Sequence, residues 1–193
     1  MGKEAAIDEA IRKTLAGDRE AFRVIVDTYG SRMIAFCRTR LASEEEARDA
    51  AQEVFIRAWS AISGFRLGES FASWLFAIAA NHVRSRFRFR AFENRKMSAA
   101  AAEIAVLPPI DPSEEASESL RSEELRRAVA KLSSDLRGSV EFYYFAGLSI
   151  SETATALKIG EEAVKSRLFR ARKKLRLALE STQPGRASGG NLK

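Results

Sequence analysis

Two segments of the chain combine basic and aromatic side chains at spacings that suit contact with nucleic acid. In the first, arginine alternates with phenylalanine over residues 86–90. In the second, Phe169 stands among Lys165, Arg170 and Lys173. Aromatic rings stack on unpaired bases, while guanidinium and ammonium groups contact phosphates and base edges. These residue types therefore favour nucleic-acid binding as the chemistry of the chain.

Charge is segregated along the sequence. Lys and Arg total 32 against 26 Asp and Glu, which gives a net charge of +6. Basic residues concentrate in 84–96 and 165–176, and acidic residues concentrate between these two blocks. A soluble helix face normally mixes the two signs, so the separation favours an anionic partner over a merely solvated surface.

The sequence is poor in residues that perform catalysis or bind metal. It has one histidine, His82, and one cysteine, Cys37, and we expect both to be packed core residues. They exclude a disulfide framework and argue against a structural zinc site, so no cofactor and no metal is expected. A nucleic-acid-processing enzyme would need a carboxylate cluster or a nucleophile with its base, and no such motif stands out. The chain is predicted not to be an enzyme.

Helical periodicity dominates on both sides of a segment that contains Pro108, Pro109 and Pro112. Prolines interrupt helices, so this segment reads as a linker. Apolar residues elsewhere recur at helical spacing without strand alternation. The predicted fold is all-α, with two small helical domains at 1–96 and 120–180, a flexible acidic linker at 97–119 and a disordered tail at 181–193.

The C-terminal domain is predicted to contain a helix-turn-helix. Ser149 and Glu152 have the spacing of a capping box, the turn falls at 158–160, and a long helix follows. On that helix, Val164, Leu168 and Ala171 share one stripe, while Phe169 lies on the opposite, basic side. A partner must cover this ring, and DNA is one candidate. An arginine-rich helix that packs on another protein is the alternative.

The run from Val164 to Leu175, VKSRLFRARKKL, resembles the region 4 helix-turn-helix of bacterial sigma factors, particularly the extracytoplasmic function (ECF) group. In that family the second helix reads the −35 promoter element as duplex DNA. The resemblance implies that the −35 DNA-binding residues are Lys165, Ser166, Arg167, Phe169, Arg170 and Lys173.

A second surface is predicted on the helix that contains the sequence DAAQEVF. Ala47, Ala51, Val54, Phe55, Ala58 and Ile62 share a core stripe, and the opposite face holds Asp49, Gln52, Glu53 and Ile56. An apolar side chain with a polar rim is typical of a contact patch. The motif resembles sigma region 2, whose helix docks on core RNA polymerase. The resemblance implies a core-polymerase-binding set of Asp49, Gln52, Glu53, Ile56 and Arg57.

The third candidate surface follows a loop at 65–70 and a helix that begins at about Phe71. Trp74 and Asn81 fall on an outward arc, although a half-buried core position is the alternative for Trp74. The sequence WLFAIAAN resembles sigma region 2.3–2.4, which opens the −10 element and captures a flipped base. The −10 DNA-binding residues implied by this resemblance are Phe65, Trp74, Asn81, Arg84, Arg86 and Arg88.

These expectations together describe a sigma factor. Its partners would be core RNA polymerase, promoter DNA (the −35 element as duplex and the −10 strand melted) and an anti-sigma factor. We expect a cytoplasmic protein that joins the nucleoid with polymerase, because no signal peptide or apolar run of ~20 residues is evident. The alternative is a stand-alone helix-turn-helix regulator that binds operator DNA without polymerase.

Overall fold

The computed structural model describes residues 3–41, 43–97 and 114–182, and it describes side chains for 5–41, 43–85 and 122–181. These residues form helices joined by short turns, and no strand occurs among them. The all-α prediction is therefore confirmed. Most of the predicted linker (98–113) and of the predicted tail (183–193) lies outside the described residues.

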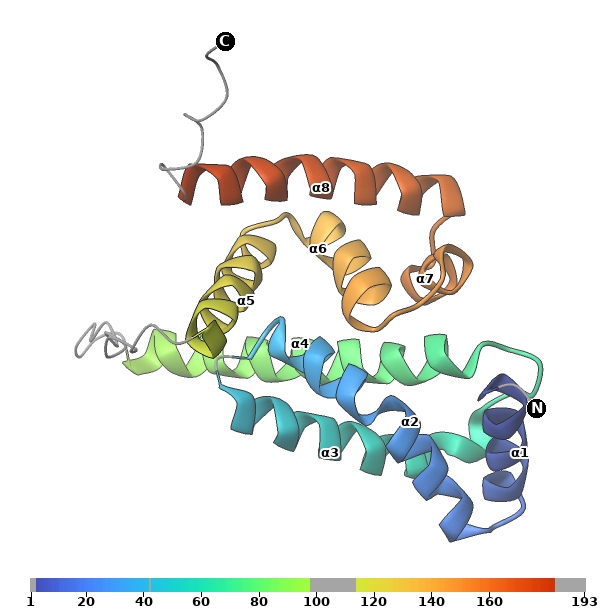
Figure 1. The fold of residues 1–193 in the computed structure, drawn as a ribbon. Helices are drawn as coiled ribbons and strands as arrows, with labels where there is room; N and C mark the ends of the chain where they lie inside the picture. The colour runs from blue at the N-terminus through green and yellow to red at the C-terminus, as the bar shows by residue number, and fades with distance from the viewer. Residues whose placement is uncertain (1–2, 42, 98–113, 183–193) are drawn as a thin grey trace.

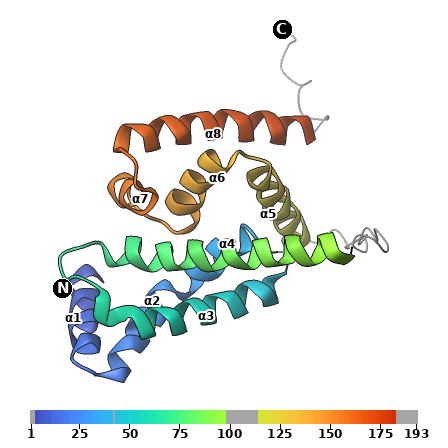
Figure 2. The same cartoon turned by 180° about the vertical axis from the view of Figure 1, so that it is seen from behind.

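The helices form two layers on either side of α4. Figure 1 shows α4 crossing the middle of the molecule, with α1 and α3 on one side and α5–α8 on the other, while α2 crosses α4 and its C-terminal end reaches the second group; Figure 2 shows the same order from behind. In chain order the elements are α1 (Lys3–Leu15), α2 (Arg19–Arg38), α3 (Glu44–Ala61), the 3₁₀ turn η1 (Ile62–Gly64), α4 (Phe71–Met97), α5 (Glu114–Ala130), α6 (Ser134–Val140), the π-helical turn η2 (Glu141–Phe145), α7 (Ile150–Leu157) and α8 (Glu161–Thr182).

Helices α1–α4 form the N-terminal half, and polar caps and a large aliphatic-aromatic core stabilise it. The Asp18 carboxylate accepts hydrogen bonds from the backbone N–H groups of Glu20 and Ala21 at the start of α2. The Ser43 hydroxyl accepts one at the start of α3. The core contains fully buried Phe36 and Phe76, whose ring centroids lie 5.4 Å apart. Burial of each such side chain contributes about 1.5–3 kcal/mol.

Helices α5–α8 form the C-terminal half, in which α7 and α8 make the predicted helix-turn-helix. The predicted capping box is present, because the Ser149 side chain and the Glu152 side chain each bond the other residue's backbone N–H. Helix α7 ends at Leu157, and its cap residue Lys158 has a left-handed backbone with φ 55°. The turn therefore begins at Lys158, within the predicted range 158–160.

Two predicted helix boundaries differ from the structure. Helix α5 begins at Glu114, inside the segment predicted as linker, and not at Leu120. The spacing of apolar residues also predicts a helix over Ser139–Phe145, whereas in the structure it starts earlier, at Ser134, and continues into the π-helical turn η2. Helix α5 extends into a sequence rich in Ser, Glu and Ala, and α6 extends over 134–138, where Leu136 is the one apolar side chain, so periodicity gives a weak signal at both places.

The two halves share an apolar core where they meet, and we call their contact surface the seam. Phe142, Ala146 and Leu148 of the C-terminal half are buried in the core of the N-terminal half. The rings of Phe36 and Phe142 lie 5.4 Å apart across this surface. The sequence predicts two domains joined by a flexible linker and leaves their relative orientation open; in the structure they pack together.

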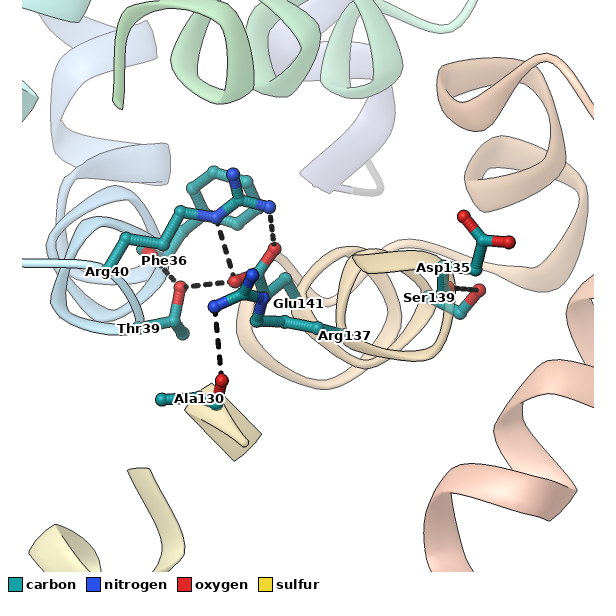
Figure 3. Close-up of polar contacts among 8 residues, drawn as sticks. All are labelled: Phe36, Thr39, Arg40, Ala130, Asp135, Arg137, Ser139 and Glu141. Carbon is teal, nitrogen blue, oxygen red and sulfur yellow. Dashed lines mark hydrogen bonds and ion pairs between the residues drawn. The ribbon is translucent and has the colours of Figure 1, made fainter. Parts of the chain in front are cut away.

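A buried ion pair fixes one end of the seam. The carboxylate of Glu141 is fully buried and accepts hydrogen bonds from Arg40 Nε at 2.9 Å, Arg40 Nη2 at 2.5 Å and Thr39 Oγ1 at 3.0 Å (Figure 3). A buried carboxylate is tolerated only when it is paired and hydrogen-bonded in this way. The pair therefore ties the C-terminal end of α2 to the start of η2.

Arg32 of α2 caps the end of η2. Arg32 Nε donates a hydrogen bond to the carbonyl oxygen of Ala146 at 2.6 Å, and Nη2 donates to the carbonyls of Ala146 and Gly147. Gly147 has φ +65°, and a Cβ added there would lie 3.1 Å from Arg32 Nε. Glycine is thus required at this position both by its backbone conformation and by the closeness of Arg32.

Glu152 joins the other end of the seam to the start of α4. Its carboxylate accepts a hydrogen bond from Ser70 Oγ at 2.8 Å, and its backbone carbonyl accepts one from Ser73 Oγ at 3.0 Å. Partial burial raises the pKa of Glu152, but hydrogen bonds from Ser149 and Ser70 and the charge of Arg32 outweigh it, so the pKa lies below its ordinary value. The carboxylate form is the one that these contacts stabilise.

The substitution Glu141→Ala should lower the free energy of unfolding by about 3–5 kcal/mol, because it leaves Arg40 largely buried without its partner. The double variant Arg40→Met/Glu141→Leu should recover most of that loss, because it replaces the pair with apolar side chains. Urea unfolding monitored by circular dichroism measures both. Equal stability of the single variant and the unsubstituted protein would contradict this account.

The seam contact at Glu152 should weaken in acid. Because the pKa of Glu152 is lowered in the folded protein, its contribution is complete above the ordinary value of 4.5 and is lost as the pH falls below that value through the folded pKa. The difference in unfolding free energy between the unsubstituted protein and Glu152→Gln should be constant from pH 7 to about 4.5 and should shrink below it. A difference that does not change with pH would contradict the assignment.

Candidate nucleic-acid interface

Helix α8 presents the basic and aromatic face that the sequence predicts. Val164, Leu168 and Ala171 are buried against the other helices of the C-terminal half, as expected from their spacing. On the opposite side, the Phe169 side chain is 65% exposed. Burial of a ring of this size would contribute about 1.5–3 kcal/mol, and the fold leaves that contribution unused at Phe169.

The polar side chains predicted on this face are exposed, with one exception. Ser166, Arg170 and Lys173 are exposed, and so is Lys165, whose pKa is raised by its hydrogen bond to Glu162 at 2.6 Å and by the charge of that carboxylate. Arg167 is the exception. It is partly buried, and its Nη2 lies 3.6 Å from Asp135 Oδ2, so it packs α8 against α6.

A hollow beside α8 is lined in part by residues outside the predicted −35 DNA-binding set. It has a volume of about 470 Å³ and lies between the start of α6 and the middle of α8, where Lys174 and Leu177 line it with Arg170 and Lys173. Lys174 and Leu177 stand four and seven positions after Arg170, a spacing that places them on one helix face. Extension of the helical pattern beyond Lys173 would have found them.

Helix α3 presents an acidic surface with an exposed apolar centre, which we call the α3 patch (Asp49, Gln52, Glu53 and Ile56). All four residues are exposed, and Ile56 is 61% exposed. Arg57 borders the patch, and its Nε lies 3.9 Å from Glu53 Oε2 in an exposed ion pair. The opposite face is buried as predicted, through Ala47, Ala51, Val54, Phe55 and Ala58.

The start of α4 holds the third predicted surface, and it differs in part from the expectation. Helix α4 begins at Phe71, as predicted, and Asn81 and Arg84 are exposed on it. Phe65 is buried, with its ring centroid 5.2 Å from that of Phe71. Phe65 was expected to contact DNA, but it instead supports the loop from within the core.

Trp74 is half-buried, and its ring centroid lies 5.4 Å from that of Phe65. This position agrees with the alternative that the sequence left open for Trp74. Arg86 and Arg88 belong to α4, but they lie beyond the last residue of that helix whose side chain the structure describes. His82 and Cys37 are buried, as predicted.

The described residues offer no group of histidine, cysteine and carboxylate side chains that could hold a metal ion. Within the same residues, no helix combines the length and the apolar character needed to cross a membrane.

Comparison with known proteins identifies both halves. A family model for sigma-70 region 2 matches residues 25–93, and one for sigma-70 region 4 matches residues 122–175. The RNA polymerase sigma factor NccH of Alcaligenes xylosoxydans is 33% identical over 183 residues, which cover 93% of this chain and 98% of NccH. The ECF RNA polymerase sigma factor SigW of Bacillus subtilis is 32% identical, over 91% of this chain and 98% of SigW.

Solved structures show the same fold. CnrH, in complex with the cytosolic domain of CnrY, superposes with a TM-score of 0.71 at 24% identity, over 91% of this chain and 98% of CnrH. The sigma factor RpoE from Bartonella quintana, in complex with the anti-sigma factor NepR, gives a TM-score of 0.65 at 24% identity, over 82% of this chain and 96% of RpoE. Both regions match in order along the chain, and the matched relatives are similar to it in length. The chain therefore belongs to the ECF group of RNA polymerase sigma factors.

Proposed function

We propose that the three surfaces divide the work of promoter-specific initiation, with the α3 patch on core RNA polymerase, the start of α4 on the −10 strand and α8 on the −35 duplex. The observation that carries the proposal is the exposed Ile56 within the acidic α3 patch. DNA would be repelled by this patch, so its partner is a protein with a basic surface. A stand-alone DNA-binding regulator would have no use for it.

The α3 patch combines the two features of a protein-binding surface. Ile56 supplies apolar area at the centre, and Asp49, Gln52 and Glu53 supply a polar rim that selects the partner by charge. The fully buried alanines on the other side of α3, Ala47 and Ala50, let the helix pack closely on the core. The patch is therefore held on a rigid element before binding, which limits the entropy lost on association.

Helix α4 is proposed to contact the melted −10 strand. Asn81 offers both a donor and an acceptor to an unpaired base, and Arg84, Arg86 and Arg88 would contact the phosphates. Phe65 is assigned a different task from the one expected from sequence. Its ring packs on Phe71 and Trp74, which positions the loop that would receive an extruded base.

Helix α8 is proposed to enter the major groove of the −35 element. Arg170 can donate two hydrogen bonds to a guanine edge, and Phe169 can contact a thymine methyl group. Lys165, Ser166 and Lys173 flank them and would contact bases or phosphates, together with Lys174 on the rim of the hollow. Arg167 is proposed to orient α8 through Asp135.

The seam must open for both elements to be read at once. The names of the elements place them about 25 base pairs apart, or roughly 85 Å along duplex DNA at about 3.4 Å per base pair. In the structure α7 packs on the start of α4. Ser70, in the loop at 65–70, donates a hydrogen bond to Glu152. We expect binding to polymerase to separate the two halves.

The chain is proposed to act without catalysis of its own, in the cytoplasm and on the nucleoid when it is bound to polymerase. The relatives are sigma factors, which are not enzymes. CnrH and RpoE were solved with CnrY and with the anti-sigma factor NepR. By analogy, an anti-sigma factor is the proposed partner that keeps this chain from polymerase.

The charge reversal Glu53→Lys should weaken binding to core RNA polymerase about tenfold, because Glu53 is proposed to face basic residues. Its side chain is 52% exposed, so the substitution should change the thermal midpoint of unfolding very little. Fluorescence anisotropy of the labelled chain with core polymerase measures the affinity. Glu9→Lys, an exposed charge reversal on α1, is the matched control. If both variants bind like the unsubstituted protein, the α3 patch is not the polymerase surface.

Substitutions on α8 should separate base contact from phosphate contact. Arg170→Ala should reduce discrimination at one −35 position by about 1–3 kcal/mol, whereas Lys173→Gln should weaken all promoters alike and lower the salt dependence. Run-off transcription with reconstituted holoenzyme on promoters changed at single −35 positions measures this. Lys13→Gln on α1 is the control. Unchanged −35 preference in Arg170→Ala would contradict the assigned reading face.

A further inference from the structure

The seam contains a hollow whose lining is rich in arginine. It has a volume of about 250 Å³ and lies where the end of α2 meets α5 and α6. Both halves of the chain contribute to it. Its charged lining residues are Arg38, Arg40, Glu123, Arg126, Arg127 and Arg137.

The carboxylates near this hollow do not satisfy its arginines. Glu123 is the acidic residue that lines the hollow, and its carboxylate lies near three arginines. The nitrogen-to-oxygen distances are 3.0 Å for Arg126, 3.5 Å for Arg127 and 3.9 Å for Arg38. Glu141 accepts its hydrogen bonds from Arg40 and Thr39. Among the side chains that the structure describes here, guanidinium groups therefore outnumber carboxylates, and the 3.9 Å between Arg38 Nη2 and Glu123 Oε2 exceeds hydrogen-bond distance.

Arg137 adds an unsatisfied donor. Its Nη1 donates to the carbonyl oxygen of Ala130 at 3.3 Å, and Figure 3 shows its guanidinium beside Glu141. Its Nε is buried and has no hydrogen-bond partner among the described residues. A buried N–H without an acceptor is destabilising, so the internal contacts of the seam leave this guanidinium incompletely hydrogen-bonded.

We propose that this hollow is a binding site for a small phosphate-bearing anion, either inorganic pyrophosphate or the diphosphate end of a nucleotide. Arginine forks donate paired hydrogen bonds to phosphate oxygens, and several converging guanidinium groups match a ligand with several negative charges. The volume lies below the range of about 300–1,000 Å³ that holds drug-sized ligands, so the hollow suits a small anion.

The site exists only while the two halves are in contact. Arg38 and Arg40 come from the end of α2, whereas Arg126, Arg127 and Arg137 come from α5 and α6. A ligand that bridges both sets binds the closed arrangement and not the separated halves, so it shifts the population toward the closed one. This proposal goes beyond the promoter function and does not depend on it.

Isothermal titration of the full-length protein with sodium pyrophosphate, at constant ionic strength, tests the site. Saturable binding should weaken about tenfold in Arg127→Gln, because one charged contact is lost. The Arg127 side chain is 61% exposed, so this variant should fold normally. Arg137→Lys keeps the charge but loses the fork, and it should weaken binding as well. Arg23→Gln, an exposed arginine on α2, is the control and should bind like the unsubstituted protein.

Titration with a nucleoside diphosphate distinguishes the two sources of the anion. Tighter binding than pyrophosphate identifies a nucleotide, and weaker binding identifies the free anion. Small-angle scattering should show that the ligand lowers the mean radius of gyration of the protein toward the value of the closed arrangement. The proposal is overturned if no saturable binding occurs, or if Arg127→Gln, Arg137→Lys and Arg23→Gln all bind equally. Promoter-specific transcription by the holoenzyme is measured separately, so its outcome does not enter this test.

Discussion

The arrangement of the two halves depends on one electrostatic constraint, the burial of the Glu141 carboxylate. A carboxylate without water is stable only when donors surround it, and here those donors come from the other half of the chain. Arg40 and Thr39 supply them, and Phe36 packs on Phe142 beside them. Because polar and apolar contacts coincide at this place, a small rotation of one half would break both kinds at once.

The same constraint relates structure to activity. Contacts that close the seam involve the loop at 65–70 through Ser70, while the α3 patch and the exposed face of α8 stay open to solvent. In the proposed function, the protein can therefore meet polymerase through the α3 patch before its halves part. The proposed opening exchanges internal contacts for external ones, so it requires a free energy of polymerase binding that exceeds the free energy of the seam.

Local features of the fold could be predicted from the sequence, and features that join distant residues could not. The capping box of Ser149 and Glu152 and the buried stripe of α8 depend on spacings of three or four residues, which the sequence displays directly. The bond between Thr39 and Glu141 joins residues 102 positions apart, and nothing in either segment indicates the other. Phe65 illustrates the same limit, because the resemblance implies a DNA contact for it, while in the structure Phe71 and Trp74 pack on its buried ring.

The π-helical turn η2 has a further consequence for how the halves part. Arg40 donates hydrogen bonds to Glu141, the first residue of η2. Arg32 donates one to the carbonyl oxygen of Ala146, which directly follows the last residue of η2. A wide helical turn is an uncommon backbone arrangement, and both groups that brace it leave together when α2 withdraws. In the proposed separation η2 therefore loses both contacts, and we expect its backbone to relax toward ordinary α-helical hydrogen bonding, so that amide exchange in η2 would report the parting of the halves.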